Sequence, residues 1–386
     1  MRKFFEFQNA AKIICGDAAL KTIGKELSSL GASKPMLLTS ANAAKLGVKE
    51  KVKSTLLAEA FSEPFVPESV PQTIDLEYAK KQKNAYISER CDSIVAVGGD
   101  EVMDTAKVIK LLLSQDWDEI LPIATECVAA GKDVPLIAIP SENGSGKEAN
   151  GYVEVGEYYI SSPALVPSVV IIDEDVAMAA PTREIAACGA YALANAIEGY
   201  IEAEETGVSD VYAEKSIRLL SKNLLKAVAD SQDEEACRAT ALAATLGGVA
   251  YGATPYGAAH ALAEGMSEVT KEPLEEMFAL TIVPSVKKAL EKSEEKIKNV
   301  LYLLEGADVF AETPASERAE RAIASVQEIL DKLHEYSGLA TKISETKIRR
   351  EDFGLIAEAA TNKRASITAF GPLSKDEFLE MLNNAF

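Results

Sequence analysis

Histidine is scarce in this chain, since only His260 and His334 occur among its 386 residues. No site in the protein can therefore contain three histidine ligands. The cysteines are no better suited to metal binding, because they are scattered, odd in number and form no C-x-x-C pair. They are Cys15, Cys91, Cys127, Cys188 and Cys237. This pattern indicates neither a disulfide framework nor a thiolate metal site, and we expect reduced thiols in a cytoplasmic protein.

Positive charge and long apolar runs are also in short supply. Lysine and arginine total 40 against 60 acidic residues, which gives a formal charge of −20. Nucleic acids and anionic membranes require positive surface, so we expect neither as a partner. No run approaches the roughly 18 apolar residues of a membrane span. The first residues, MRKFFEFQNAAKII, contain no apolar region with a small-residue cleavage site, so we expect no secretory signal.

Two kinds of pattern divide the chain near Ala180–Pro181. Before this point, short buried runs at 12–15, 35–39, 94–97, 136–140, 152–159 and 168–172 alternate with helical stretches. Such alternation predicts a mostly parallel sheet with helices on both faces, a Rossmann-like α/β domain over residues 1–180. After it, the stretches are alanine-rich and helical, at 186–203, 210–229, 234–250, 258–269, 274–290, 315–334, 351–360 and 375–385. They predict an all-α domain over residues 181–386.

The stretch 94–107, IVAVGGDEVMDTAK, has the order strand, glycine turn and helix. Gly98 and Gly99 are placed to make the turn, and Asp100 is placed to cap the helix that follows. The free N–H groups and the positive dipole end of such a helix meet at one point. We therefore predict an anion-binding site at this turn.

Six segments in a fixed order along nearly the whole chain carry a family resemblance. They are KIICGDAALKTIGKEL, DSIVAVGGDEVMDTAK, LIAIPSENGSGKE, VVIIDEDVAMAAPTREIAACGAYALANAIEGYI, GAAHALAEGM and ATNKRASITAFGPLSKDEF. Together they resemble the iron-containing alcohol dehydrogenase family, which shares its fold with dehydroquinate synthase. The resemblance implies NAD or NADP and a divalent iron or zinc ion in an interdomain cleft, where small alcohols and aldehydes or ketones are interconverted. It also implies a small-molecule ligand in that cleft and a homodimer or larger assembly.

The family's phosphate loop reads GGGS, two residues, Asp, one residue, Ala and Lys. Gly98, Gly99 and Asp104 match it, whereas Asp100 and Glu101 replace a glycine and the serine. Two unit charges 4 Å apart interact by about 4 kcal/mol at an intermediate dielectric, so these acids are expected to oppose a pyrophosphate. The alternative is that Asp100 only caps the helix and Glu101 faces solvent.

Two further loops complete the cofactor positions that the resemblance implies. The family's PTTAGTGSE is PSENGSGKE here, so Ser141 and Ser145 replace threonines that donate hydrogen bonds, and Glu142 adds an acid. Ser40 ends the predicted strand 35–39, where many NAD-using members have an aspartate. Without that carboxylate the site would accept a 2′-phosphate more easily. The alternative is that Ser40 is only a turn residue.

The metal ligands of the family are an aspartate, a histidine four residues later and two further histidines. His260 matches one of them, while Tyr191, Asn195 and Leu274 occupy the other three positions. Glu264 stands where the family has the histidine that faces the nicotinamide. The resemblance therefore implies one matching ligand in four, and His334 lies far outside the motif.

A rebuilt site is one alternative at these positions. His260, Glu264 and Glu268 follow one another by one helical turn, and a His/Glu/Glu set facing Asn195 and Tyr191 can hold a divalent ion. The other alternative is a hydrogen-bonded cluster around a lone histidine. Tyr191 and Glu264 are the candidate catalytic residues, with Tyr191 as proton donor in a metal-free reduction. Alternatively, Tyr191 fills the void left by a lost ion.

Three functions remain open from the sequence. The first is an active NAD(P)-dependent oxidoreductase with a rebuilt site, because a metal-dependent hydride transfer needs a Lewis acid. The second is an inactive member that acts as a binding protein or joins an active relative in a hetero-oligomer. The third is catalysis on a different, non-anionic ligand. Loss of metal ligands together with gain of acids at the phosphate loop favours the second.

Overall fold

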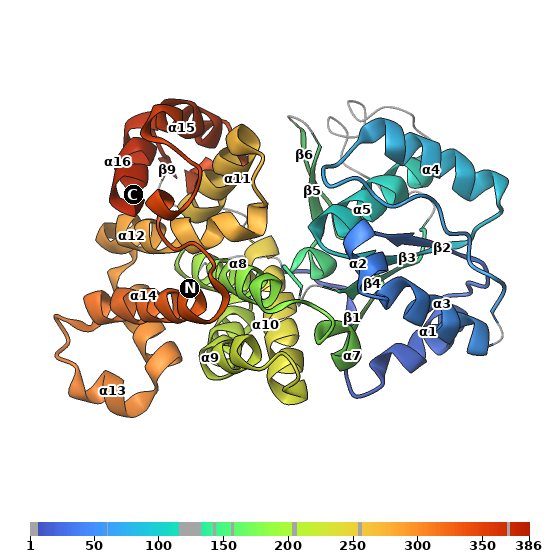
Figure 1. Ribbon diagram of the computed structural model, residues 1–386, viewed down its shortest axis with the longest axis horizontal. Coiled ribbons are helices and arrows are strands. Elements are labelled where there is room, and N and C mark those ends of the chain that lie inside the picture. The colour runs from blue at the N-terminus through green and yellow to red at the C-terminus, as the bar shows by residue number, and fades with distance from the viewer. Residues whose placement is uncertain are drawn as a thin grey trace. The chain divides into compact units, whose positions relative to one another are not determined.

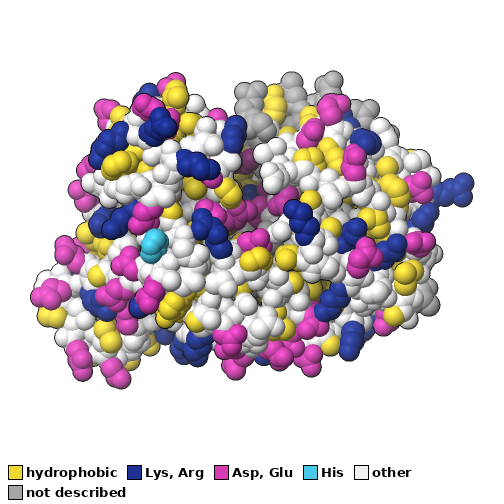
Figure 2. All heavy atoms as spheres, viewed as in Figure 1, with side chains coloured by type: hydrophobic (Ala, Val, Ile, Leu, Met, Phe, Trp, Pro, Cys, Tyr) yellow, Lys and Arg dark blue, Asp and Glu magenta, His cyan; other side chains and the backbone are white. Residues whose placement is uncertain are grey.

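The computed structural model describes residues 7–59, 61–115, 133–141, 144–155, 158–202, 207–253, 257–368 and 371–386. Two compact units make up the chain, Gln8–Ala180 and Pro181–Phe386, and Phe7 belongs to the second. Glu142 falls outside the described residues. None of the helices in the described ranges is long and apolar enough to cross a membrane. Acidic side chains are spread over the surface of both units in the view of Figure 2, in keeping with the charge of −20.

The first unit is built on a five-stranded parallel sheet (Figure 1). Its strand order is β1-β7-β4-β3-β2, and all its pairings are parallel. The strands are β1 (Lys12–Gly16), β2 (Pro35–Thr39), β3 (Ser93–Gly98), β4 (Leu136–Pro140) and β7 (Val169–Asp173). All five residues of β2, β4 and β7 are buried, as expected for strands that are covered on both faces.

Two apolar cores lie on opposite faces of this sheet. Ile94 and Ala96 of β3 belong to one core, and Val95 and Val97 belong to the other, because successive side chains of a strand point to opposite faces. The predicted parallel sheet with helices on both faces is confirmed. The helices of this unit are η1 (Ala19–Thr22), α1 (Ile23–Ser29), α2 (Ala41–Lys45), α3 (Val48–Ala58), α4 (Leu76–Ser88), α5 (Asp100–Gln115), η2 (Lys147–Ala149), η3 (Pro163–Leu165) and α7 (Glu174–Ala177).

One predicted strand of this unit is wrong. The stretch 152–159 is divided between β5 (Tyr152–Val155) and β6 (Tyr158–Ser161), which pair antiparallel as a separate two-stranded sheet. Val153 and Ile160 are paired in this ribbon and both are buried. Antiparallel strands need only a short connection, so one continuous run of strand-forming residues can contain both.

The second unit is helical, as predicted, apart from one pair of two-residue strands, β8 (Ile367–Thr368) and β9 (Gly371–Pro372). The predicted helix 274–290 continues to Glu305 with a break in helical geometry at Ser293, because buried apolar residues resume beyond the polar stretch. The helices are α8 (Thr182–Ile201), α9 (Ser209–Ala229), α10 (Glu234–Ala253), α11 (Ala258–Thr270), α12 (Leu274–Glu305), α13 (Ala307–Glu312), α14 (Arg318–Ser337), η4 (Ile343–Glu345), η5 (Arg350–Asp352), α15 (Phe353–Thr361), η6 (Arg364–Ser366) and α16 (Lys375–Ala385).

Helix α8 is the core of this unit. Every residue from Ile185 to Ile201 is buried, and α8 packs against α9, α10 and α12. A helix that is buried on all sides must satisfy any polar side chain it carries from within the protein. Asn195 and Glu198 are such side chains, so their partners define the polar centre of the helical unit.

Candidate functional site

The turn between β3 and α5 has the order that the sequence predicts, with one correction. The N–H groups of Val102 and Met103 both donate to the carbonyl of Gly99 at 3.2 Å, so Gly99 precedes the helix and Asp100 is its first residue. Asp100 is therefore not the cap. Its carboxylate instead accepts a hydrogen bond from the hydroxyl of Ser145, which lies in the loop after β4.

Gly98 is required by the packing of the helix itself. A Cβ at this position would lie 2.4 Å from Cγ2 of Val102 and 3.5 Å from Oγ of Ser40. We expect Gly98→Ala to lower the free energy of unfolding by about 1–3 kcal/mol through overpacking, as measured by urea denaturation. Adding Val102→Ala removes the clashing atoms and should recover part of that loss. Full stability of the single variant would contradict this reading.

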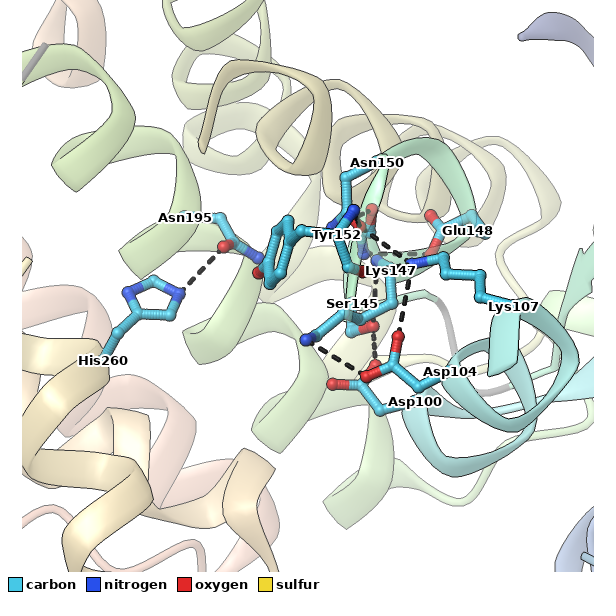
Figure 3. A network of polar contacts seen from close by, with 11 residues as sticks. Asp100, Asp104, Lys107, Ser145, Lys147, Glu148, Asn150, Tyr152, Asn195 and His260 are labelled. Carbon is cyan, nitrogen blue, oxygen red and sulfur yellow. Dashed lines mark hydrogen bonds and ion pairs between the residues drawn. The ribbon is translucent and has the colours of Figure 1, made fainter. Parts of the chain in front are cut away.

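The Asp104 carboxylate lies between two lysines of this unit (Figure 3). Its Oδ1 is 3.2 Å from Nζ of Lys107, and its Oδ2 is 3.2 Å from Nζ of Lys147. The fully buried Lys107 also donates to Oδ1 of Asn150 at 2.8 Å and to the carbonyl of Tyr152 at 3.1 Å. Nζ of Lys147 lies 4.3 Å from the centre of the Tyr152 ring. These contacts attach the loop after β4 to α5.

The pKa values of the two lysines are shifted in opposite directions. Burial lowers the pKa of the Lys107 ammonium, and the Asp104 carboxylate opposes this only in part. Burial also acts to lower the pKa of Lys147, but the carboxylate of Asp104 and other nearby acids outweigh it, so the pKa lies well above its ordinary value. Lys147 is therefore held as a cation, and Asp104 is its main counterion.

The remaining predicted cofactor residues are Ser40, Ser141 and Glu101, and each has a different environment. Ser40 accepts a hydrogen bond from the N–H of Ala43 at 3.0 Å and so caps α2, which agrees with its reading as a turn residue. Ser141 is fully buried, its N–H donates to the carbonyl of Gly98 at 3.3 Å, and its hydroxyl has no partner among the residues that the structure describes. Glu101 is half-buried in the first turn of α5.

In the helical unit, each ring nitrogen of His260 is hydrogen-bonded to a side-chain oxygen. Nε2 lies 3.0 Å from Oδ1 of Asn195, as Figure 3 shows. Nδ1 lies 2.5 Å from Oε2 of Glu198. All three side chains are at most 2% exposed. Each ring nitrogen therefore already has a hydrogen-bond partner within the protein, in the place where a metal ligand would leave one nitrogen for the ion.

Glu198 is the centre of this network. Its carboxylate also accepts the N–H of Ala259 at 2.7 Å, the N–H of His260 at 3.3 Å and the hydroxyl of Ser285 at 2.5 Å. The first two bonds place a negative charge at the N-terminus of α11, where the helix dipole favours it. Gly257 leaves room for the carboxylate, because a Cβ there would lie 2.1 Å from Oε2.

Aromatic rings enclose the histidine. The Tyr251 ring stacks on it with centroids 3.7 Å apart, and the Tyr191 ring stacks on Phe278 at 4.0 Å. Tyr191 is 2% exposed and its centroid is 5.7 Å from that of His260. This packing favours a structural role for Tyr191, which fills the core, over the role of proton donor to a substrate.

The residues at the metal positions do not fit a divalent ion. Tyr191, Asn195 and His260 are brought together, but the side-chain amide of Asn195 is hydrogen-bonded to Nε2 of His260. The rebuilt His/Glu/Glu set is not assembled, since Glu268 pairs with Lys363 at 2.6 Å. Glu264, the other candidate catalytic residue, lies half-buried on α11 one turn after His260. Over the described ranges, no three His, Cys, Asp or Glu side chains are grouped as ion ligands.

Sequence reasoning missed two residues of these clusters. Glu198 lies on α8 at i+7 from Tyr191 and i+3 from Asn195, a spacing that places all three on one face of the helix. Lys147 stands where the family motif has a serine, and a cation at such a position is a signal that an acid lies nearby; its partner is Asp104, which the motif retains. Both signals are visible in the sequence, although neither identifies the partner.

Two family models match this chain. The model described as iron-containing alcohol dehydrogenase matches residues 10–174, and the C-terminal model of the Fe-containing alcohol dehydrogenase family matches residues 185–386. The NAD-dependent methanol dehydrogenase of Bacillus methanolicus is 26% identical over 358 residues, which are 90% of this chain and 91% of that protein. The choline dehydrogenase of Bacillus subtilis is 30% identical over 281 residues, which are 70% and 69%. The crystal structure of a 1,3-propanediol oxidoreductase superposes with a TM-score of 0.91 at 24% identity, with 100% of each chain covered.

Proposed function

Because the chain belongs to the iron-containing alcohol dehydrogenase family of oxidoreductases, we propose that it is a member without metal-dependent hydride transfer, which acts by binding. The observation that carries this proposal is the pair of hydrogen bonds on His260. The one ligand position that the chain retains is engaged on both nitrogens, by Glu198 and by Asn195. A Lewis acid that polarises the alcohol or carbonyl oxygen would have no ligand set here.

The replacements at the other ligand positions support the same proposal. Leu274 offers no donor atom, and the phenol ring of Tyr191 is stacked in the core. The chain's own residues here orient one another, with Glu198 fixing both the imidazole of His260 and the first turn of α11. At the positions where the family motif holds a catalytic ion, these residues stabilise the packing of the helices.

The binding role that we propose is that of a partner subunit. Family models match both halves of the chain, and the fold is retained over the full length of a solved relative. A chain that keeps the fold and loses the metal ligands is expected where the surface of the protein still binds another subunit. We propose assembly as a homodimer or with an active relative in a hetero-oligomer, measured by native mass spectrometry of the chain alone and after mixing with a metal-loaded family member.

Metal analysis of the purified protein tests the loss of metal-dependent chemistry. We expect iron and zinc contents far below one ion per chain, both as isolated without chelator and after incubation with Fe²⁺ under argon. Oxidation of small alcohols with NAD or NADP should be undetectable in either preparation. One tightly held ion per chain would refute the proposal.

A variant with the ligands restored supplies the matched control. Tyr191→Asp, Asn195→His and Leu274→His together recreate the ligand types that the family motif has at these positions. We expect this variant to bind iron or zinc where the parent chain does not, provided that circular dichroism shows it folded. If the folded variant also fails to bind metal, the scaffold rather than the ligand set excludes the ion, and our argument from His260 is wrong.

A further inference from the structure

The start of α5 is joined by side-chain contacts to the segment after β4, in the place where the family resemblance implies a dinucleotide phosphate. The hydroxyl of Ser145 donates to the carboxylate of Asp100, across 45 residues of sequence. Lys147, two residues after Ser145, pairs with Asp104, one turn after Asp100. The start of α5 and the segment after β4 therefore each supply two side chains to one network of charge and hydrogen bonds (Figure 3).

Asp100 lies in the first turn of α5, at the end of the helix that favours anions. Free N–H groups and the helix dipole stabilise a negative charge at the first turn, whether it comes from a phosphate or a carboxylate. As the first residue of α5, Asp100 supplies such a charge from within the chain. Glu101 adds a second acid in the same turn.

The groups that would receive a phosphate here are already engaged. A serine hydroxyl has one hydrogen to donate, and that of Ser145 is used by Asp100. The ammonium of Lys147 is 3.2 Å from Asp104 and lies over the Tyr152 ring. Among the described residues of 98–107 and 141–148, the acids Asp100, Glu101, Asp104 and Glu148 outnumber Lys107 and Lys147 by two. These residues do not fit a pyrophosphate.

We propose that the Asp100 carboxylate, held by Ser145, is an internal substitute for a nucleotide phosphate and excludes dinucleotides from this loop. The inference goes beyond the proposed function, because the network lies within the α/β unit and the metal positions lie within the helical unit. A chain without bound metal could still bind a dinucleotide, and a chain that excludes dinucleotides could still bind metal. The two proposals therefore fail independently.

Titration with NADH and NADPH, followed by nicotinamide fluorescence, tests this inference. We expect no saturable binding by the parent chain up to about 1 mM, and at least a tenfold tighter dissociation constant for Asp100→Gly combined with Glu101→Ser. Saturable binding by the parent chain below that concentration would overturn the inference. So would a folded double variant that gains nothing, since the shape of the loop rather than its carboxylate would then be the obstacle. Metal content should stay unchanged throughout.

Two single variants separate the charge from the contact. Glu101→Ser leaves the Asp100–Ser145 bond intact, so it should gain little affinity. Asp100→Asn keeps the size of the side chain and can still accept from Ser145, so an intermediate gain is expected from loss of charge alone. A gain in Glu101→Ser equal to that of the double variant would assign the exclusion to Glu101 and overturn the role of Asp100.

Inorganic pyrophosphate provides a readout that does not depend on the nicotinamide. At fixed ionic strength it should raise the melting temperature of the Asp100→Gly, Glu101→Ser variant and leave that of the parent chain unchanged, because only a ligand of the folded state stabilises it. Equal shifts in both proteins would mean that the loop of the parent chain is open to phosphate, which contradicts the inference.

Discussion

Glu198→Ala is expected to lower the free energy of unfolding by about 3–5 kcal/mol, the range seen when one partner of a buried charged network is removed. Four donors lose their acceptor at once, namely the N–H groups of Ala259 and His260, Nδ1 of His260 and the hydroxyl of Ser285. All of them lie in the interior of the helical unit, so water does not replace the carboxylate without opening the core.

Urea denaturation followed by circular dichroism measures this effect, and two variants control for it. Glu198→Gln keeps the shape and one acceptor oxygen, so it should lose less stability than Glu198→Ala. Glu320→Ala, at an exposed position on α14, should stay within about 0.5 kcal/mol of the parent. A loss below about 1 kcal/mol in Glu198→Ala would show that the network around His260 is not a structural centre.

The α/β unit was largely predictable because its signals are local. Runs such as PMLLT and LIAIP can be buried on both faces only in a covered sheet, and they form β2 and β4. The errors occur where local signals are ambiguous. One apolar run contained both β5 and β6, and a polar stretch before Ile297 resembled a helix end although the apolar face of α12 continues beyond it. Continuation past such a stretch depends on packing partners that the sequence does not name.

The candidate site was predictable in its positions and not in its contacts. Helical spacing places Tyr191 and Asn195 on one face of α8, and the motif identifies His260 as their counterpart. In the structure His260 and Asn195 are hydrogen-bonded to each other. The sequence alone left open whether that histidine faces an ion or a hydrogen-bonded cluster. The structure adds Glu198 to the hydrogen bonds of that histidine, a residue that the motif comparison did not single out. In the same way, the acids of the phosphate loop were evident, but the bond from Ser145 to Asp100 joins residues that no local pattern connects.

Asp104→Ala should be comparably destabilising in the α/β unit, again by about 3–5 kcal/mol. The substitution leaves two buried ammonium groups 3.2 Å from the position of a lost counterion. Lys107 keeps its bonds to Asn150 and to the carbonyl of Tyr152, so Lys147 is the more poorly compensated of the two. Replacing it as well, in Asp104→Ala with Lys147→Ser, should recover a substantial part of the loss. The recovery is non-additive because the two residues share one interaction.

The pH dependence of this loss distinguishes charge from packing. Without Asp104, burial is opposed by fewer acids, so the pKa of Lys107 in the folded state falls further below its ordinary value of 10.5. Between the folded and unfolded pKa values the unfolded chain then binds more protons, and stability rises with pH. The cost of Asp104→Ala, measured as the difference from the parent chain in urea, should therefore be smaller at pH 10 than at pH 7. The same cost at both pH values would assign the loss to the cavity left by the side chain, and the buried lysines would then have no part in it.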